Sequence, residues 1–284
     1  MIPSPFDYLR PRTVEETVQY LDEAGEDAAL LAGGQSLVPA LRCRDAVPAV
    51  VVDLSEVEEL RGIRVEDDQI VVGAMTTLRR LATDPIIAEH APLLATAARL
   101  AGDRRTRTMA TLGGSLALAD PAADLPTAAV ALDATLLLAG PEGRRTTSAR
   151  SFFVEPYTTA LGLADVLVEM RFPTRFGWGA HYTKVCRTTP GWAVVGVAAL
   201  LRQEDGVVTD ARVVFTNMGP VPVRSRPAEE ALLGARLTDA IVGAAADAGA
   251  DESEPVDDAA ATAPYRRQLA RTLTRRAVRA AAGR

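Results

Sequence analysis

The chain has 284 residues, of which 48% are hydrophobic, and a formal net charge of −6. This length is enough for two or three domains with a large buried core. The net charge is negative, and the one sustained basic stretch covers residues 265–284. This argues against a nucleic-acid surface elsewhere on the protein. No apolar stretch reaches the roughly 20 residues of a membrane span. The first five residues also lack the pattern of a signal peptide, so we expect a cytoplasmic protein.

The sequence offers few metal ligands. It contains two cysteines, Cys43 and Cys186, and two histidines, His90 and His181, with no Cys-x-x-Cys arrangement. This argues against a cysteine-ligated zinc or iron–sulfur site within the chain. Redox chemistry would therefore need an organic cofactor or a partner. The cysteines are interpreted as packed hydrophobic residues without a role.

The first 60 residues predict a small βαβ-like unit. A helix is expected over residues 13–24, because Thr13 can cap it and apolar residues follow at helical spacing. Short apolar runs predict strands over residues 28–32 and 49–52. An apolar strand thus leads directly into the first of two Gly-Gly sequences.

The next hundred residues mix strands and helices. Alternating runs over residues 62–65 and 69–73 are typical of a hairpin. Helices are expected over residues 78–81 and 88–101, and an Ala-rich helix is expected to open near Asp120 and Asp124. Further strands are predicted over residues 134–139 and 166–172, the second closed by Pro173.

Beyond Pro173, three runs at residues 181–185, 192–202 and 206–217 predict an antiparallel sheet, with Asp205-Gly206 as a hairpin turn. Helices are expected over residues 227–233, 240–248 and 265–282, and the last of these is basic and amphipathic. The whole chain is therefore predicted to be α+β.

Two Gly-Gly sequences are the most informative feature. The first glycine motif is Leu31-Ala32-Gly33-Gly34-Gln35-Ser36, and the second is Thr111-Leu112-Gly113-Gly114-Ser115. A backbone without side chains, followed by a hydroxyl, allows the close approach that a phosphate needs. Each Gly-Gly alone is most often only a tight turn. Neither motif matches the Rossmann G-x-G-x-x-G, and no Walker loop occurs.

The two glycine motifs, together with residues 6–11, 37–44, 51–60, 116–126 and 219–224, resemble the FAD-binding (medium) subunit family of molybdenum hydroxylases. The medium subunit of carbon monoxide dehydrogenase and the flavin domain of xanthine dehydrogenase are well-known members. The resemblance covers nearly the whole chain in order. It implies a two-subdomain FAD-binding fold, with subdomains at residues 1–58 and 59–174, and a C-terminal domain of antiparallel sheet and helices at residues 175–284.

The resemblance also implies which residues hold FAD. The pyrophosphate would lie against groups of both motifs, namely Ala32, Gly33, Gly34, Gln35, Ser36, Leu37, Thr111, Gly113, Gly114 and Ser115. Backbone amides can do this without any net positive charge.

For four further residues, the resemblance implies a place near FAD, and each also has an ordinary structural alternative. Asp124 matches an acidic residue that contacts the cofactor, or it caps a helix. Val168 lies where the family packs an apolar residue against FAD, or it is ordinary core. Lys184 matches a lysine near the isoalloxazine, or it is a solvated surface residue. Trp192 stands where relatives carry an aromatic residue over one flavin face, or it is a core residue.

The sequence departs from the family pattern just before the second glycine motif. Relatives usually have Arg-Asn-Arg-Gly there, whereas this chain has Arg107-Thr108-Met109-Ala110, and a frequent histidine is replaced by Leu118. We expect whatever that loop touches to change accordingly.

Three functions stay open on the sequence alone. In the first, FAD here carries electrons from iron–sulfur and molybdopterin partner subunits to NAD, quinone or oxygen. In the second, the chain is a free-standing flavoenzyme with its own small substrate over the flavin. In the third, it is a relative without cofactor. No Ser-His-Asp or other catalytic set is found, so catalysis within the chain would rest on FAD.

Overall fold

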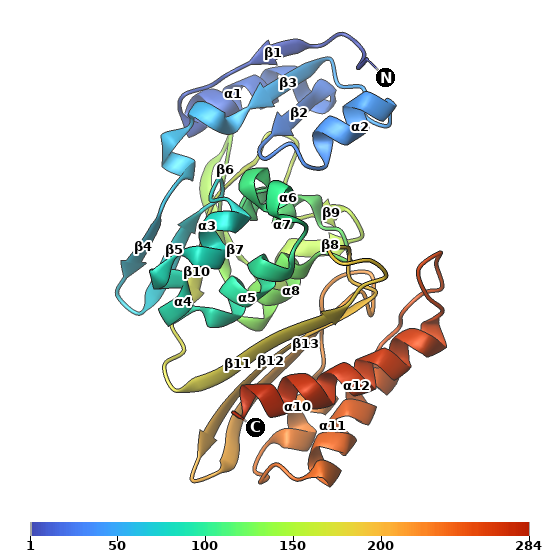
Figure 1. Ribbon diagram of the computed structural model, residues 1–284. Helices are drawn as coiled ribbons and strands as arrows, with labels where there is room; N and C mark the ends of the chain where they lie inside the picture. Colours follow the sequence, from blue (N-terminus) through green and yellow to red (C-terminus); the bar gives the residue numbers. More distant parts are fainter. Residues whose placement is uncertain (1, 284) are drawn as a thin grey trace.

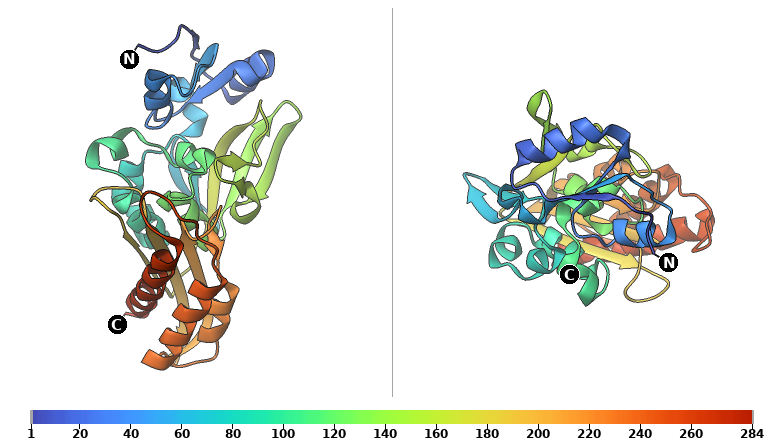
Figure 2. Two further views of the ribbon diagram at one scale, coloured as in Figure 1. Left: turned by 90° about the vertical axis from the view of Figure 1, so that its right-hand side faces the viewer. Right: turned by 90° about the horizontal axis from the view of Figure 1, so that it is seen from above.

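The computed structural model describes residues 2–283. Three regions, each built around its own sheet, follow one another along the long axis of the molecule (Figure 1). The N-terminal region lies at one end and the C-terminal helices lie at the other, which the turned view in Figure 2 also shows.

The N-terminal sheet is parallel, with the strand order β1-β3-β2. Its strands are β1 (Asp7–Leu9), β2 (Ala28–Leu31) and β3 (Val50–Asp53). The expected helix is α1 (Val14–Ala24), and Thr13 caps it by accepting a hydrogen bond from the N–H of Glu16. The sequence analysis did not predict β1 or the short helix α2 (Leu37–Cys43) that follows the first glycine motif. The 3-10 turns are η1 (Gly25–Asp27), η2 (Leu54–Glu56) and η3 (Glu58–Leu60).

The middle sheet is antiparallel, with the order β4-β5-β10-β6-β7. Its strands are β4 (Ile63–Glu66), β5 (Gln69–Gly73), β6 (Thr135–Gly140), β7 (Gly143–Ser148) and β10 (Val166–Pro173). The predicted hairpin at residues 62–73 is thus confirmed. One face of this sheet packs on the region's helices, and residues of the other face pack with α1. A small ladder joins β8 (Phe153–Glu155) to β9 (Thr158–Thr159).

The helices of the middle region differ from the prediction at one proline. Residues 88–101 do not form one helix, because the chain bends at Ala91, which has φ −141° and ψ 60°. Pro92 disfavours a helical conformation at Ala91 and has no N–H to donate, so it starts a new helix instead. The helices here are α3 (Leu78–Thr83), α4 (Pro85–His90), α5 (Pro92–Leu100), α6 (Arg104–Met109), α7 (Leu112–Leu118), α8 (Asp124–Ala131) and α9 (Ala149–Phe152).

The second glycine motif is not a turn, which corrects the prediction. Gly113 and Gly114 lie in the first turn of α7. Thr111 caps this helix, since its Oγ1 accepts a hydrogen bond from the N–H of Gly114 at 3.1 Å. A glycine in a helix lowers its stability by roughly 0.5–1 kcal/mol relative to alanine, so these two glycines need a packing reason.

The C-terminal sheet is antiparallel, as predicted, with the order β11-β12-β13-β14. Its strands are β11 (Trp178–Val185), β12 (Val195–Glu204), β13 (Val207–Thr216) and β14 (Val223–Arg224). Alternate residues of β12 face opposite sides: Val197 and Ala199 pack towards the C-terminal helices, whereas Ala198 and Leu200 join the core of the middle region. The helices are α10 (Arg226–Leu232), α11 (Asp239–Glu252) and α12 (Ala263–Ala281). The middle and C-terminal regions therefore share a core.

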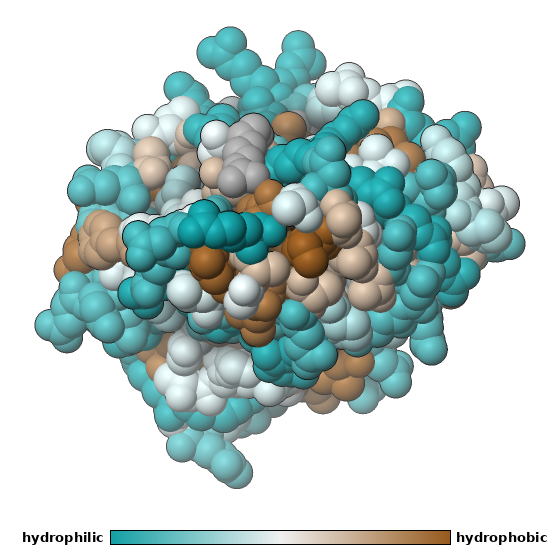
Figure 3. All heavy atoms as spheres, turned by 90° about the horizontal axis from the view of Figure 1, so that it is seen from below, coloured by the Kyte–Doolittle hydropathy of each residue, from teal (hydrophilic) through white to brown (hydrophobic). Residues whose placement is uncertain are grey.

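The end of the molecule opposite the N-terminus is mostly hydrophilic. Figure 3 shows a few hydrophobic residues gathered near the middle of this face, with hydrophilic residues around them. Within residues 2–283, none of the helices is both long enough and apolar enough to cross a bilayer.

Candidate functional site

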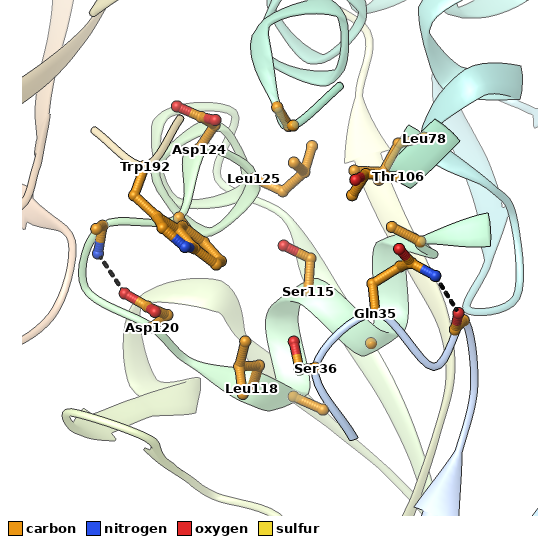
Figure 4. Close-up of a pocket in the computed structure, with 18 of the residues that line it drawn as sticks. Gln35, Ser36, Leu78, Thr106, Ser115, Leu118, Asp120, Asp124, Leu125 and Trp192 are labelled. Carbon is orange, nitrogen blue, oxygen red and sulfur yellow. Dashed lines mark hydrogen bonds between the residues drawn. The ribbon is translucent and has the colours of Figure 1, made fainter. Parts of the chain in front are cut away.

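A cavity of about 1490 Å³ lies between the two glycine motifs. All three regions contribute to its wall, because it is lined by segments near residues 32–37, 110–125, 187–194, 217–220 and 256–260. It is larger than the roughly 300–1,000 Å³ typical of small-ligand pockets, so it has room for a long ligand such as a dinucleotide. Figure 4 shows Trp192 on the opposite side of the cavity from Gln35 and Thr106, with Ser36 and Ser115 between them.

The first glycine motif presents a row of free backbone donors. Among the described residues, none accepts a hydrogen bond from the N–H groups of residues 33–37. Gly34 has φ +69°, a conformation that favours glycine. Five consecutive N–H groups without partners among the described residues, at the edge of a cavity, can donate to an anion such as a phosphate.

The second glycine motif has no comparable row, because the N–H groups of residues 112–115 all have partners. The N–H of Leu112 donates to the carbonyl of Thr76 at 2.9 Å, and that of Gly113 donates to the carbonyl of Ala74 at 2.8 Å. A Cβ on Gly113 would lie 2.6 Å from the Cβ of Ala74. These glycines therefore allow close packing of α7 on the strand end, and the motif offers the cavity side-chain hydroxyls rather than backbone amides.

The two serines that follow the glycines face this space. Neither the Ser36 hydroxyl nor the Ser115 hydroxyl hydrogen-bonds to another of the described residues, and both point into the cavity in Figure 4. They add two donors beside the backbone row.

The charged side chains of the cavity wall are mostly acidic. Its aspartates are Asp103, Asp120, Asp124 and Asp258, and Arg187 is the one cationic side chain among the lining residues that the structure describes. Phosphates would therefore be held by neutral dipoles and not by side-chain cations. The free N–H row, the two hydroxyls and the length of the cavity fit an FAD molecule.

Asp124 has a role different from capping. Its carboxylate accepts a hydrogen bond from the Tyr182 hydroxyl at 2.6 Å and another from the Lys184 ammonium at 2.7 Å. It binds no N–H of α8, so the capping alternative is wrong. Burial raises the pKa of the Asp124 carboxyl, while Lys184 and Tyr182 act in the opposite direction. Burial and the Asp124 charge together raise the pKa of the Tyr182 hydroxyl well above its ordinary value.

Lys184 is not a solvated surface residue. Its side chain is 5% exposed, and its Nζ donates to Asp124 and to the carbonyl of Gly191 at 2.9 Å. It lies behind the cavity wall and does not line the cavity itself. Val168 is also absent from the lining and is buried in β10 against the core that includes α1.

Trp192 is not a core residue. It is 59% exposed and lines the cavity from the loop between β11 and β12. A large exposed aromatic ring beside a cavity offers a stacking surface. The other predicted residues that line the cavity are Ala32, Gly33, Gly34, Gln35, Ser36, Leu37, Thr111, Gly113, Gly114 and Ser115.

The segment that departs from the family pattern borders the first glycine motif. A Cβ on Gly33 would clash with the backbone carbonyl of Met109 and lie 2.8 Å from the Cα of Ala110. Ala110 and Leu118 line the cavity, whereas Met109 is exposed. The sequence analysis missed further lining residues, among them Asp103, Tyr157, Arg187 and Asp258, because no local motif marks them.

Two family models together cover almost the whole chain. The model described as the FAD-binding domain in molybdopterin dehydrogenase matches residues 4–175. The model described as the CO dehydrogenase flavoprotein C-terminal domain matches residues 180–281. The chain therefore belongs to the FAD-binding medium subunits of the molybdenum hydroxylases. It is an oxidoreductase subunit with FAD as its cofactor.

Particular relatives cover the same length. The chain is 40% identical over 282 residues to the carbon monoxide dehydrogenase medium chain of Hydrogenophaga pseudoflava, covering 99% of this chain and 98% of that one. It is 35% identical to the corresponding chain of Afipia carboxidovorans, covering 100% and 99%. A solved structure of the Hydrogenophaga pseudoflava enzyme, lacking the Mo-pyranopterin moiety of its cofactor, superposes with a TM-score of 0.97 at 42% identity, covering 100% and 99%.

Proposed function

We propose that this chain holds one FAD along the cavity and passes electrons from iron–sulfur and molybdopterin partner subunits to an acceptor. The row of free N–H groups at residues 33–37 carries the proposal, because such a row at the edge of a cavity suits a pyrophosphate. The comparisons give no support to the free-standing flavoenzyme.

Different groups of residues would bind different parts of FAD. The N–H groups of the first glycine motif, with Ser36 and Ser115, would hold the pyrophosphate. Trp192 would cover one face of the isoalloxazine and exclude water from it. Asp124 and Lys184 would set the charge beside that ring. When bound, FAD supplies the redox chemistry that links one-electron iron–sulfur donors to an acceptor.

The two cysteines support the cytoplasm as the location. Cys43 is exposed, so its interpretation as a packed residue is wrong, and both Cys43 and Cys186 are free thiols, the state that a reducing compartment maintains.

A titration tests the cofactor assignment. The purified chain should bind FAD at one per chain, and ADP should compete with FAD because it carries the same pyrophosphate. Riboflavin, which lacks the pyrophosphate, should compete far less. Calorimetry together with the visible spectrum measures all three. Equal competition by riboflavin and ADP would contradict a site centred on the first glycine motif.

A further inference from the structure

Trp192 combines an exposed ring with a firmly held main chain. The residue is 59% exposed and lies in the loop between β11 and β12. The carbonyls of both its neighbours, Gly191 and Ala193, nevertheless accept side-chain hydrogen bonds from other elements. An exposed loop residue rarely needs such support.

Lys184 provides the first anchor. Its Nζ donates to the Gly191 carbonyl at 2.9 Å, and the buried Asp124 carboxylate holds the same ammonium at 2.7 Å. Lys184 is the only lysine among the 31 basic residues of the sequence. A compact ammonium can serve two acceptors within this space, whereas a planar guanidinium would need a different geometry.

Asn217 provides the second anchor. Its Nδ2 donates to the Ala193 carbonyl at 2.7 Å. Asn217 directly follows β13 with φ +61°, a conformation that asparagine tolerates better than most residues. It is also the only asparagine in the sequence. The local backbone and the amide donor together account for this residue type.

The main chain is held further on both sides. The N–H of Ala193 donates to the Ala122 carbonyl at 3.2 Å. The buried Arg266 of α12 donates to the Val194 carbonyl. Gly191 itself packs so closely that a Cβ would lie 2.5 Å from the Thr188 carbonyl oxygen. The backbone around Trp192 is thus fixed, and little more than the indole torsions are left free.

We propose that Lys184 and Asn217 are positioning residues that set the indole of Trp192 at the cavity edge before the flavin binds. The inference rests on the proposed function, in which Trp192 covers the isoalloxazine. A ring whose main chain is held in place in advance loses less freedom on binding, which increases affinity. Neither residue needs to touch the flavin to have this effect.

The sequence allows a clean optical test, because Trp178 and Trp192 are its only tryptophans. In a Trp178→Phe background, indole emission reports on Trp192 alone. The variants are Asn217→Gly, which accepts the positive φ but removes the donor, and Asn217→Asp, which keeps the shape. Lys184→Gln tests the other anchor, and Gln268→Ala, an exposed amide on α12, is the control.

Two quantities are measured, the anisotropy decay of FAD-free protein and the quenching of Trp192 on FAD titration. We expect the anchor variants to show faster local motion of the indole. We also expect weaker quenching and an FAD Kd about threefold to tenfold higher, the effect of losing one hydrogen bond. The control should match the background protein.

The outcomes separate the two proposals. If bound FAD fails to quench Trp192 in the background protein, the proposed place of Trp192 over the flavin is wrong, and this inference is wrong with it. If quenching is intact but both Asn217 variants and Lys184→Gln keep the background anisotropy and Kd, only the positioning inference is overturned.

Discussion

Gly33 packs directly against the main chain of Met109 and Ala110. Because a Cβ there would clash with the Met109 carbonyl, we expect Gly33→Ala to push the first glycine motif away from the segment before α7. FAD should then bind about tenfold more weakly or worse. Equilibrium dialysis against FAD measures the change.

Gly243→Ala is the matched control for this substitution. Gly243 lies inside α11, and an added Cβ would have only the end of the Arg275 side chain nearby, at 3.9 Å. This variant should keep its FAD affinity and gain about 0.5–1 kcal/mol of stability from helix propensity. Equal losses of FAD affinity in both variants would contradict the account.

Asp165 gives a pH dependence of stability. Its carboxylate accepts hydrogen bonds from Arg145 at 2.8 and 2.5 Å and from the N–H of Gly162 at 2.5 Å, and its pKa is lowered chiefly by the hydrogen bond from Arg145. A folded-state pKa below the unfolded value of about 3.9 means that the unfolded state binds more protons. The contribution is therefore present at neutral pH and is lost as pH falls through the folded pKa.

We expect Asp165→Asn to lower the free energy of unfolding by about 1–2 kcal/mol at pH 7, a modest value because Arg145 is half exposed. The difference from the parent protein should shrink below about pH 4. Urea unfolding at pH 7 and pH 3 measures it. An undiminished difference at pH 3 would rule out the charge as its origin.

The sequence identified the two glycine motifs, Asp124 and Trp192 as parts of the cavity wall, but not the contacts that Asp124 makes. The first glycine motif could be found because glycine and serine types at a strand end carry a local signal. The pairing of Asp124 with Tyr182 and Lys184 could not be derived, because it joins residues about 60 positions apart. Helix-capping rules consider only nearby residues, so they predict a cap at Asp124, whereas its carboxylate binds Tyr182 and Lys184.

In α7, two residues of the second glycine motif have different roles, one in capping the helix and one at the cavity. Thr111 caps α7 through Gly114, whereas the Ser115 hydroxyl faces the cavity. Thr111→Val should lower stability by about 1 kcal/mol and leave most of the FAD affinity. Ser115→Ala should weaken FAD binding and leave the stability almost unchanged. Thermal unfolding and FAD titration of both variants measure this, and a large loss of FAD affinity in Thr111→Val alone would reverse the assignment.

Elements with strong periodicity were predictable, and those set by long-range contacts were not. The helices α1 and α12 and the hairpin at residues 62–73 follow from apolar spacing. The short helices α2 and α6 carry little periodicity, and packing stabilises helices of that length more than propensity does. The strand β1 has three residues and exists through its pairing with β3.

At the scale of the whole molecule, the cavity exists only where the three regions meet. Its wall combines segments from residue 30 to residue 260. The succession of three sheet-containing regions along the chain could be predicted, because each sheet is built mostly from segments that are close in the sequence. The cavity itself could not, since loop positions depend on side-chain anchors such as Arg266, which binds the Val194 carbonyl.

We expect the whole chain to assemble with its partner subunits. The proposed function requires partners, so the chain co-expressed with the iron–sulfur and molybdopterin subunits should elute with them as one complex. Size-exclusion chromatography with metal and flavin analysis of the peak measures this. A chain that elutes alone, with its FAD, while the other two subunits assemble without it would favour the free-standing flavoenzyme.

The most direct measurement is the structure of the chain loaded with FAD. We expect the pyrophosphate within hydrogen-bonding distance of the N–H groups of residues 33–37 and the isoalloxazine against the Trp192 indole. Pyrophosphate bound elsewhere, with those N–H groups facing solvent, would contradict it.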